Sequence, residues 1–157
     1  MLITSIFKII HKLKIHYIVS KGVKIGRDTY ISPTAYIDLG KPNLIEIGSN
    51  CYITRDVMIL SHTDTKKGGP LCIWKDIGGT REYGSVKIGN NVFIGVKSVI
   101  MPGVTIADDV IIGAMTLVNR DVPKGKIVFG IPGRIVGKTI EHIRGKNNKY
   151  IDISSSL

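Results

Sequence analysis

VKIGNNVFIGVKSVIMPGVTIADDVIIGAMTLVNRDVP, residues 86–123, carries an aliphatic side chain at every sixth position. These positions are Ile88, Ile94, Ile100, Ile106, Ile112 and Val118. A period of six fits neither an α-helix nor a long alternating strand, whereas hexapeptide repeats are typical of parallel β-helices. If each hexad forms one side and one corner of a triangular prism, three hexads make a turn of 18 residues. The pattern therefore predicts neighbouring turns about 4.8 Å apart, with these stacks: Ile88 under Ile106, Ile94 under Ile112, and Ile100 under Val118.

The same rhythm runs through the chain before this segment, with two interruptions. Repeat positions fall at Val19, Ile25, Ile31 and Ile37 and, after a break at residues 39–44, at Ile47, Ile53 and Ile59. The second break, residues 60–86, is long, polar and without a period. Excursions that leave a solenoid at a corner keep its core intact and tend to line the working face. We therefore expect the functional site at this second break.

Several motifs follow one another in the order typical of one family. They are IGNNVFIG (88–95), PGVTI (102–106), IGA (112–114), DVP (121–123) and GIPGRIVGK (130–138). In these motifs the chain resembles the left-handed β-helix acyltransferases. Within that family it is most similar to the maltose and galactoside O-acetyltransferase-like enzymes, including those that modify bacterial surface polysaccharides. The resemblance implies an all-β fold, a left-handed parallel β-helix spanning residues 19–138 with a loop at 60–86.

Two further segments flank this expected domain. Residues 1–18 form an amphipathic pattern, with lysines outside the apolar face, which predicts a short helix. The predicted apolar face comprises Ile3, Ile6, Phe7, Ile10, Leu13 and Tyr17. The helix has two interpretations, a cap on the open end of the solenoid or a contact with the membrane surface, since five lysines precede the first acid, Asp28. Residues 139–157 are expected to form a short C-terminal helix and a polar tail.

Charge and cysteine content narrow the class of protein. A formal net charge of +10 favours an anionic partner, such as a phosphate-rich cofactor or an anionic membrane. The few aromatic residues do not alternate with basic ones, and no nucleic-acid-binding motif is present, so no nucleic acid is expected as partner. Two cysteines provide no disulfide framework, and Cys51 occupies a core position of the repeat. The expected location is the cytoplasm or the inner face of the membrane.

Acetyl transfer from a thioester to a hydroxyl needs a base, donors for the oxyanion and alignment of both substrates. His62 lies beside the interrupted repeat, and an imidazole has a suitable pKa for a base. The resemblance also assigns this position, in SHTD, to the general base. Asp56, Asp64 and Trp74 are candidates for acceptor binding, and Asp64 is also a candidate to orient His62. Trp74 has the alternative role of anchoring the loop.

The resemblance also implies which residues bind acetyl-CoA, the expected cosubstrate. A backbone N–H near Gly95 and Val96 would face the thioester oxygen, and the backbone of Ala114 would face the pantetheine arm. Basic and polar groups near the end of the solenoid would meet the adenine and phosphates. The implied set is Phe93, Gly95, Val96, Ala114, Asn119, Arg120, Arg134 and Lys138. Family members are homotrimers with the cofactor between neighbouring prisms, so each site would use two chains. No metal is expected.

Other functions remain open or are excluded by particular residues. A γ-type carbonic anhydrase needs three zinc-binding histidines, and only His62 lies near the expected prism wall. A serine O-acetyltransferase would carry a long helical N-terminal domain and Arg-His-Pro after GGT, where this chain has Arg81-Glu82-Tyr83. An N-acetyltransferase acting on a nucleotide-linked amino sugar and a non-catalytic scaffold also remain as alternatives. The preferred function is O-acetylation of a carbohydrate hydroxyl.

Overall fold

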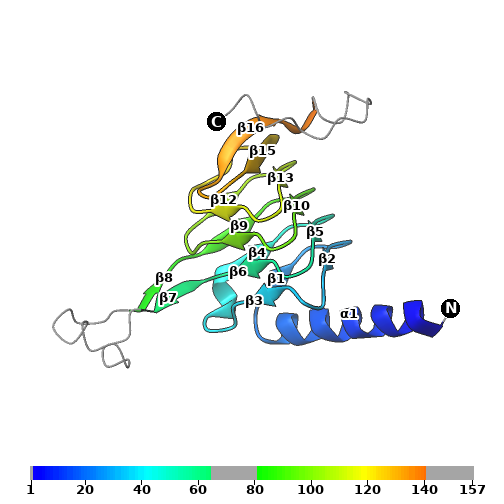
Figure 1. Ribbon diagram of the computed structural model, residues 1–157. Coiled ribbons are helices and arrows are strands. Elements are labelled where there is room, and N and C mark those ends of the chain that lie inside the picture. The colour runs from blue at the N-terminus through cyan, green and yellow to red at the C-terminus, as the bar shows by residue number, and fades with distance from the viewer. Residues whose placement is uncertain (1, 65–80, 141–157) are drawn as a thin grey trace.

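The computed structural model describes residues 2–64 and 81–140, in which short strands wind into a three-sided parallel β-helix (Figure 1). Face A consists of β1 (Lys24–Ile25), β4 (Ile45–Ile47), β9 (Val86–Ile88) and β12 (Thr105–Ile106). Face B consists of β2 (Tyr30–Ile31), β5 (Tyr52–Ile53), β10 (Phe93–Ile94), β13 (Ile111–Ile112), β15 (Lys126–Phe129) and β16 (Arg134–Lys138). Face C consists of β3 (Tyr36–Ile37), β6 (Met58–Ile59), β11 (Val99–Ile100) and β14 (Leu117–Val118).

The aliphatic stacks lie where the period of six predicts them. Strand pairing aligns Ile88 with Ile106, Ile94 with Ile112 and Ile100 with Val118. Pairing also continues across the long interruption, because Ile47, Ile53 and Ile59 align with Ile88, Ile94 and Ile100. All of these side chains are at most 5% exposed, and burying each one stabilises the fold by roughly 1.5–3 kcal/mol. The prism is therefore filled by its repeat residues, and the excursions leave the core register unchanged.

Glycines allow the coils to approach one another at the corners. A Cβ added to Gly48 would lie 2.5 Å from the carbonyl oxygen of Gly89 in the next coil. Cys51 is buried in the same stack of coils, and burial raises the pKa of its thiol. It is a core residue, as its repeat position predicts.

Three sequence expectations need correction. Val19 is not a repeat position, because α1 runs from Leu2 to Ser20 and leaves Val19 exposed. The parallel β-helix does not extend to residue 138, since β16 (Arg134–Lys138) turns back antiparallel against β15. The excursion at 60–86 is not irregular at its ends, where β7 (His62–Asp64) and β8 (Arg81–Tyr83) form an antiparallel ribbon. Most of the expected C-terminal helix lies beyond residue 140, outside the described residues.

The outward side chains differ between the three faces. Face A presents Lys24, Glu46, Lys87 and Thr105. Face B presents Tyr30, Tyr52, Phe93 and Ile111, and its aromatic rings stack on one another. Face C presents Tyr36, Met58, Val99 and Leu117. Two faces are thus apolar and one is charged.

Helix α1 lies across the first coil, at the end of the prism opposite β15 and β16 (Figure 1). Lys14 Nζ donates to the carbonyl oxygens of Pro33, at 2.7 Å, and Ala35. His11 Nε2 accepts the N–H of Ile31 at 3.3 Å. The helix therefore satisfies backbone groups that the first coil would otherwise leave without a neighbouring strand. Within residues 2–64 and 81–140, no helix has the length and apolar content needed to cross a bilayer.

Candidate active site

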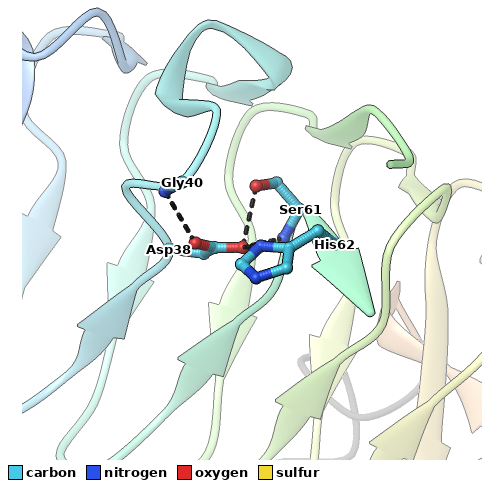
Figure 2. A network of polar contacts seen from close by, with 4 residues as sticks. All are labelled: Asp38, Gly40, Ser61 and His62. Carbon is cyan, nitrogen blue, oxygen red and sulfur yellow. Dashed lines mark hydrogen bonds and ion pairs between the residues drawn. The ribbon is translucent and has the colours of Figure 1, made fainter. Parts of the chain in front are cut away.

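A buried carboxylate holds the imidazole of His62. Asp38 Oδ2 lies 2.5 Å from His62 Nδ1 and also accepts hydrogen bonds from the Ser61 N–H (2.9 Å) and hydroxyl (2.8 Å). The Gly40 N–H donates to Asp38 Oδ1 at 2.8 Å (Figure 2). The Asp38 side chain is 2% exposed and that of His62 20% exposed. Because the carboxylate only accepts, Nδ1 carries the proton and Nε2 is the basic nitrogen.

The repeat register explains how residues 24 positions apart come together. Pairing of Ile37 with Ile59 places the residues that follow them side by side, and the Asp38 N–H donates to the carbonyl oxygen of Ile59 at 2.9 Å. Both excursions leave the prism here, one through the 3-10 helix η1 (Pro42–Leu44) and the other through the β7–β8 ribbon. We name this corner edge CA, because each strand of face C ends there before the chain reaches face A. The partly exposed imidazole of His62 lies on edge CA.

Neighbouring residues restrict the position of the imidazole. A Cβ on Gly40 would lie 3.0 Å from His62 Cε1 and 3.1 Å from Nδ1, so a side chain at position 40 would crowd the ring. Tyr83 belongs to β8, the other strand of the ribbon, and its ring centroid lies 5.8 Å from that of His62. Lys41 Nζ lies 3.9 Å from the centroid of the Tyr83 ring. The imidazole is thus fixed by a hydrogen bond and by packing, which suits a positioned base.

Acid denaturation will reveal the contribution of Asp38 to stability. Burial raises the pKa of this carboxyl, but the hydrogen bonds from Gly40, Ser61 and His62 outweigh burial and hold its pKa below the ordinary 3.8. A depressed pKa stabilises the fold above the unfolded-state value, and this stabilisation is lost as the pH falls through the folded-state pKa. Asp38→Asn has no such carboxyl. The difference in unfolding free energy between wild type and Asp38→Asn should therefore be steady at about pH 5–7 and shrink below about pH 4. Urea denaturation at each pH measures this difference in unfolding free energy. A difference independent of pH would contradict a lowered pKa of Asp38.

A basic pocket lies on the same edge, nearer the other end of the prism. Asn119, Arg120, Arg134 and Gly133 line this cavity of about 140 Å³, together with Val118, Asp121, Val122, Val128 and Ile135. Pairing through β6, β11 and β14 places Asn119 two coils from the residue preceding Ser61, which corresponds to about 10 Å along the prism. A Cβ on Gly133 would lie 2.9 Å from Val128 Cγ1 and 3.0 Å from the carbonyl oxygen of Leu117, so a larger residue at this position would crowd its neighbours. Edge CA therefore carries both an imidazole and a pocket lined by two arginines.

The other expected cofactor residues lie on a different corner. Gly95, Val96 and Ala114 follow strands of face B and precede strands of face C, at a corner that we name edge BC. Gly95 and Ala114 are in adjacent coils, since a Cβ on Gly95 would lie 2.5 Å from the Ala114 N. Asp56, exposed in the turn before β6, is on this edge as well. One chain thus divides the expected site between two edges of face C.

The remaining expected residues are distributed as follows. Phe93 lies on face B next to edge BC, with its ring centroid 6.0 Å from that of Tyr52. Lys138 is exposed at the end of β16 and does not line the basic pocket. Asp64 is on β7, where its backbone pairs with Arg81, and its side chain lies outside the described part. Trp74 falls in the segment 65–80, also outside the described residues. Among the described ranges, no group of three or more His, Cys, Asp or Glu side chains forms a candidate metal site.

Sequence reasoning missed Asp38. This residue follows a repeat aliphatic, Ile37, at a position that most other repeats fill with a small residue. An acid at such a position indicates a polar site in the fold, because a carboxylate facing a coil corner needs several hydrogen-bond donors. Aligning Ile37 with Ile59 across the first break would also have placed Asp38 beside Ser61 and His62. The acid that contacts His62 Nδ1 is therefore Asp38, from the preceding coil.

Comparison with known proteins identifies the family. The model of the bacterial transferase hexapeptide family (six repeats) matches residues 85–120. Protein CapG of Staphylococcus aureus is 35% identical over 137 residues, covering 87% of this chain and 77% of that protein. The putative acetyltransferase YvoF of Bacillus subtilis is 34% identical over 116 residues, covering 73% of this chain and 59% of YvoF. Galactoside O-acetyltransferase of Escherichia coli is 29% identical, covering 85% of this chain and 72% of that enzyme. The chain belongs to the hexapeptide-repeat transferase family.

Solved structures agree with this assignment. The maltose O-acetyltransferase from Clostridium difficile superposes with a TM-score of 0.59 at 28% identity, covering 74% of this chain and 59% of that chain. A hexapeptide-repeat acetyltransferase from Vibrio cholerae, solved with acetyl coenzyme A, gives 0.62 at 26% identity, covering 76% and 61%. The chain thus spans about three fifths of these neighbours. Its parallel coils fit the left-handed β-helix of the family, and its relatives include named acetyltransferases.

Proposed function

We propose that this chain is an acetyl-CoA-dependent O-acetyltransferase that acts on a carbohydrate hydroxyl, with His62 as general base. The supporting observation is the hydrogen bond between His62 and the buried Asp38, located on the same edge as a pocket lined by Arg120 and Arg134. Guanidinium groups suit the phosphates of coenzyme A, and the pocket lies about 10 Å along the edge from the base. Maltose and galactosides, named in two of the relatives, favour a sugar acceptor. A surface polysaccharide or its precursor is the acceptor class we favour.

In this mechanism the residues move one proton and hold one developing charge. His62 Nε2 accepts the proton of the acceptor hydroxyl as its oxygen attacks the thioester carbonyl carbon. Asp38 keeps the tautomer and stabilises the imidazolium that forms. A backbone N–H near Gly95 and Val96 donates to the oxygen that gains charge. When the carbon–sulfur bond breaks, the imidazolium returns the proton to the sulfur, releasing coenzyme A as a thiol and restoring the neutral base.

The division of the site between two edges supports a homotrimer. In a cyclic trimer each prism has two neighbours, so edge CA of one chain can face edge BC of the next. Such packing would bring His62 and Arg120 of one chain near Val96 and Ala114 of another. The apolar faces B and C suit burial against neighbours, whereas the charged face A suits solvent.

Mixing two inactive variants tests this sharing. His62→Ala removes the base from edge CA, and Ala114→Arg would place a long side chain on edge BC, where the pantetheine arm is expected. Trimers formed randomly from equal amounts of both chains should regain about one quarter of the wild-type sites, because a site combining two intact edges forms with that frequency. Thiol release from acetyl-CoA by the co-refolded mixture measures the recovery. If the mixture is no more active than the separate variants, each site belongs to one chain.

The basic pocket predicts an effect on cosubstrate binding. Arg134→Ala removes a guanidinium group from the pocket, so the KM for acetyl-CoA should rise about tenfold while kcat stays nearly unchanged. Lys124→Ala is the matched control, since it removes one positive charge close by at a residue that pairs with Asp109 and lies outside the pocket lining. Steady-state kinetics measures KM and kcat separately for both variants. Equal effects in both variants would refute specific binding at the pocket.

An acceptor screen tests the proposed function as a whole. The full chain is supplied with acetyl-CoA, and thiol release is measured with simple sugars, polysaccharide fragments, amino sugars linked to nucleotides, and serine. Transfer to a sugar hydroxyl, verified by mass spectrometry of the product, is the expected result. Preferential transfer to an amine or to serine would replace the O-acetyl sugar assignment, and the absence of thiol release with every acceptor would favour a scaffold.

A further inference from the structure

Helix α1 uses one of its faces to hold the prism. Ile18 is 3% exposed, Ile15 packs against the core, and Lys14 and His11 bind the backbone of the first coil. This inward face is not the apolar face that the sequence predicts. The predicted apolar face, with Ile10, Leu13 and Tyr17, points away from the prism.

The outward face is an exposed apolar stripe. Ile9, Ile10, Leu13 and Tyr17 are 57%, 43%, 63% and 53% exposed. Their spacing of three to four residues places them side by side along the helix. Contiguous exposed apolar side chains mark an interaction surface in a soluble fold. We call this surface the α1 stripe.

Charge identifies the partner of the α1 stripe. Residues 1–27 contain Lys8, Lys12, Lys14, Lys21, Lys24 and Arg27 and no Asp or Glu. Lys14 and Lys24 are engaged within the protein, whereas Lys12 and Lys21 are exposed near the stripe. Apolar side chains bordered by lysines are suited to the boundary between acyl chains and anionic headgroups. A second copy of the same stripe would bring lysines against lysines, which disfavours self-association.

We propose that the α1 stripe binds the surface of an anionic lipid membrane, with the helix lying in the interface plane. The arrangement of the coils gives this membrane contact a functional role, which rests on the proposed acetyl transfer. Asp38 follows a strand of the first coil, on which α1 packs, and His62 follows a strand of the second coil (Figure 1). At about 4.8 Å per coil, the base lies within two coils of the helix layer. A membrane-bound protein would thus hold its base near the headgroups, within reach of a lipid-linked carbohydrate.

Vesicle flotation of the full-length protein tests the binding. We expect the wild type to float with vesicles of phosphatidylcholine and phosphatidylglycerol, and much less with phosphatidylcholine alone. Leu13→Glu should lower binding at least about tenfold. Leu13→Lys should also lower binding although it adds a positive charge, because the apolar contact is lost. Ile140→Glu is the matched control at an exposed apolar residue at the other end of the chain's described part, and it should bind like the wild type.

Three results would overturn the proposal. The first is a wild type that remains unbound with both kinds of vesicle. The second is Leu13→Lys binding as well as the wild type, which would show that charge alone accounts for vesicle binding. A lower oligomeric state of Leu13→Glu in light scattering would instead assign the stripe to a contact between copies. Acetyl transfer to a soluble sugar is measured on the same variants. It should be unchanged by Leu13→Glu, so failure of membrane binding and failure of the enzymatic function are distinguishable.

Discussion

Replacing His62 by alanine will lower kcat for acetyl transfer by about 10²–10⁴-fold and leave acetyl-CoA binding nearly unchanged. The variant loses the nitrogen that accepts the hydroxyl proton, whereas the pocket with Arg120 and Arg134 lies two coils away and is untouched. The imidazole is only one-fifth exposed and bonds the buried Asp38, so the variant also loses some stability, and urea denaturation is used to verify that it is folded. Turnover is measured by thiol release at saturating cosubstrate, and binding by calorimetry with coenzyme A.

His16→Ala is the matched control for this experiment. His16 is exposed on α1 and should be replaceable with no change in kcat. Normal turnover of His62→Ala would show that another group accepts the proton, and the assignment of the base would then fail.

Replacing Asp38 by asparagine will have the second large effect, a loss of kcat of about 10²-fold or more, with acetyl-CoA binding retained. Every described neighbour of this carboxylate donates to it: Gly40 to Oδ1, and Ser61 and His62 to Oδ2. An asparagine in either orientation would therefore turn its NH₂ group toward a backbone N–H, since both oxygens accept one. If the NH₂ group faces His62, Nδ1 must accept, and the proton moves to the nitrogen that should act as base.

Ser61→Ala distinguishes this positioning role from a structural one. It removes one hydroxyl donor from Asp38 but keeps the carboxylate and the tautomer of His62, so kcat should fall only slightly. The stability of each variant is measured by urea denaturation beside its turnover. A structural role alone would make the loss of kcat follow the loss of stability in both variants. Equal kcat losses in Ser61→Ala and Asp38→Asn would contradict the positioning role.

The repeat made the core of this protein predictable, because a side chain that recurs at a fixed interval must stack on itself in a solenoid. The positions from Ile25 to Val118 therefore align as the period of six requires. The end of the solenoid was less predictable. After Pro123 the hexad rhythm stops, and the sign of a reversal is local: Gly130-Ile131-Pro132-Gly133 separates two short apolar runs, as a turn between antiparallel strands does.

Helix α1 shows what amphipathicity cannot decide. Periodicity finds an apolar face but does not say which side of the helix meets the protein. Here the first coil exposes backbone N–H and C=O groups, and only polar side chains can satisfy them. His11 and Lys14 therefore face inward with Ile15 and Ile18, and Leu13 faces outward.

The candidate site was predictable in part. His62 stands at the border of the long excursion, and the structure adds a buried partner to it. That partner comes from the preceding coil, so nearness in the sequence favoured Asp64, two residues away, over Asp38. The division of the expected cofactor residues between edges CA and BC follows from the three-sided cross-section. In the trimer that we propose, their assembly would need a second chain, and packing between molecules cannot be read from one sequence.

A crystal structure of the protein with coenzyme A tests the central claim most directly. We predict phosphates at Arg120 and Arg134 and a sulfur that reaches the Nε2 side of His62, at hydrogen-bond distance or through one water molecule. Coenzyme A bound on face A, or with its sulfur far from any His62, would contradict the account.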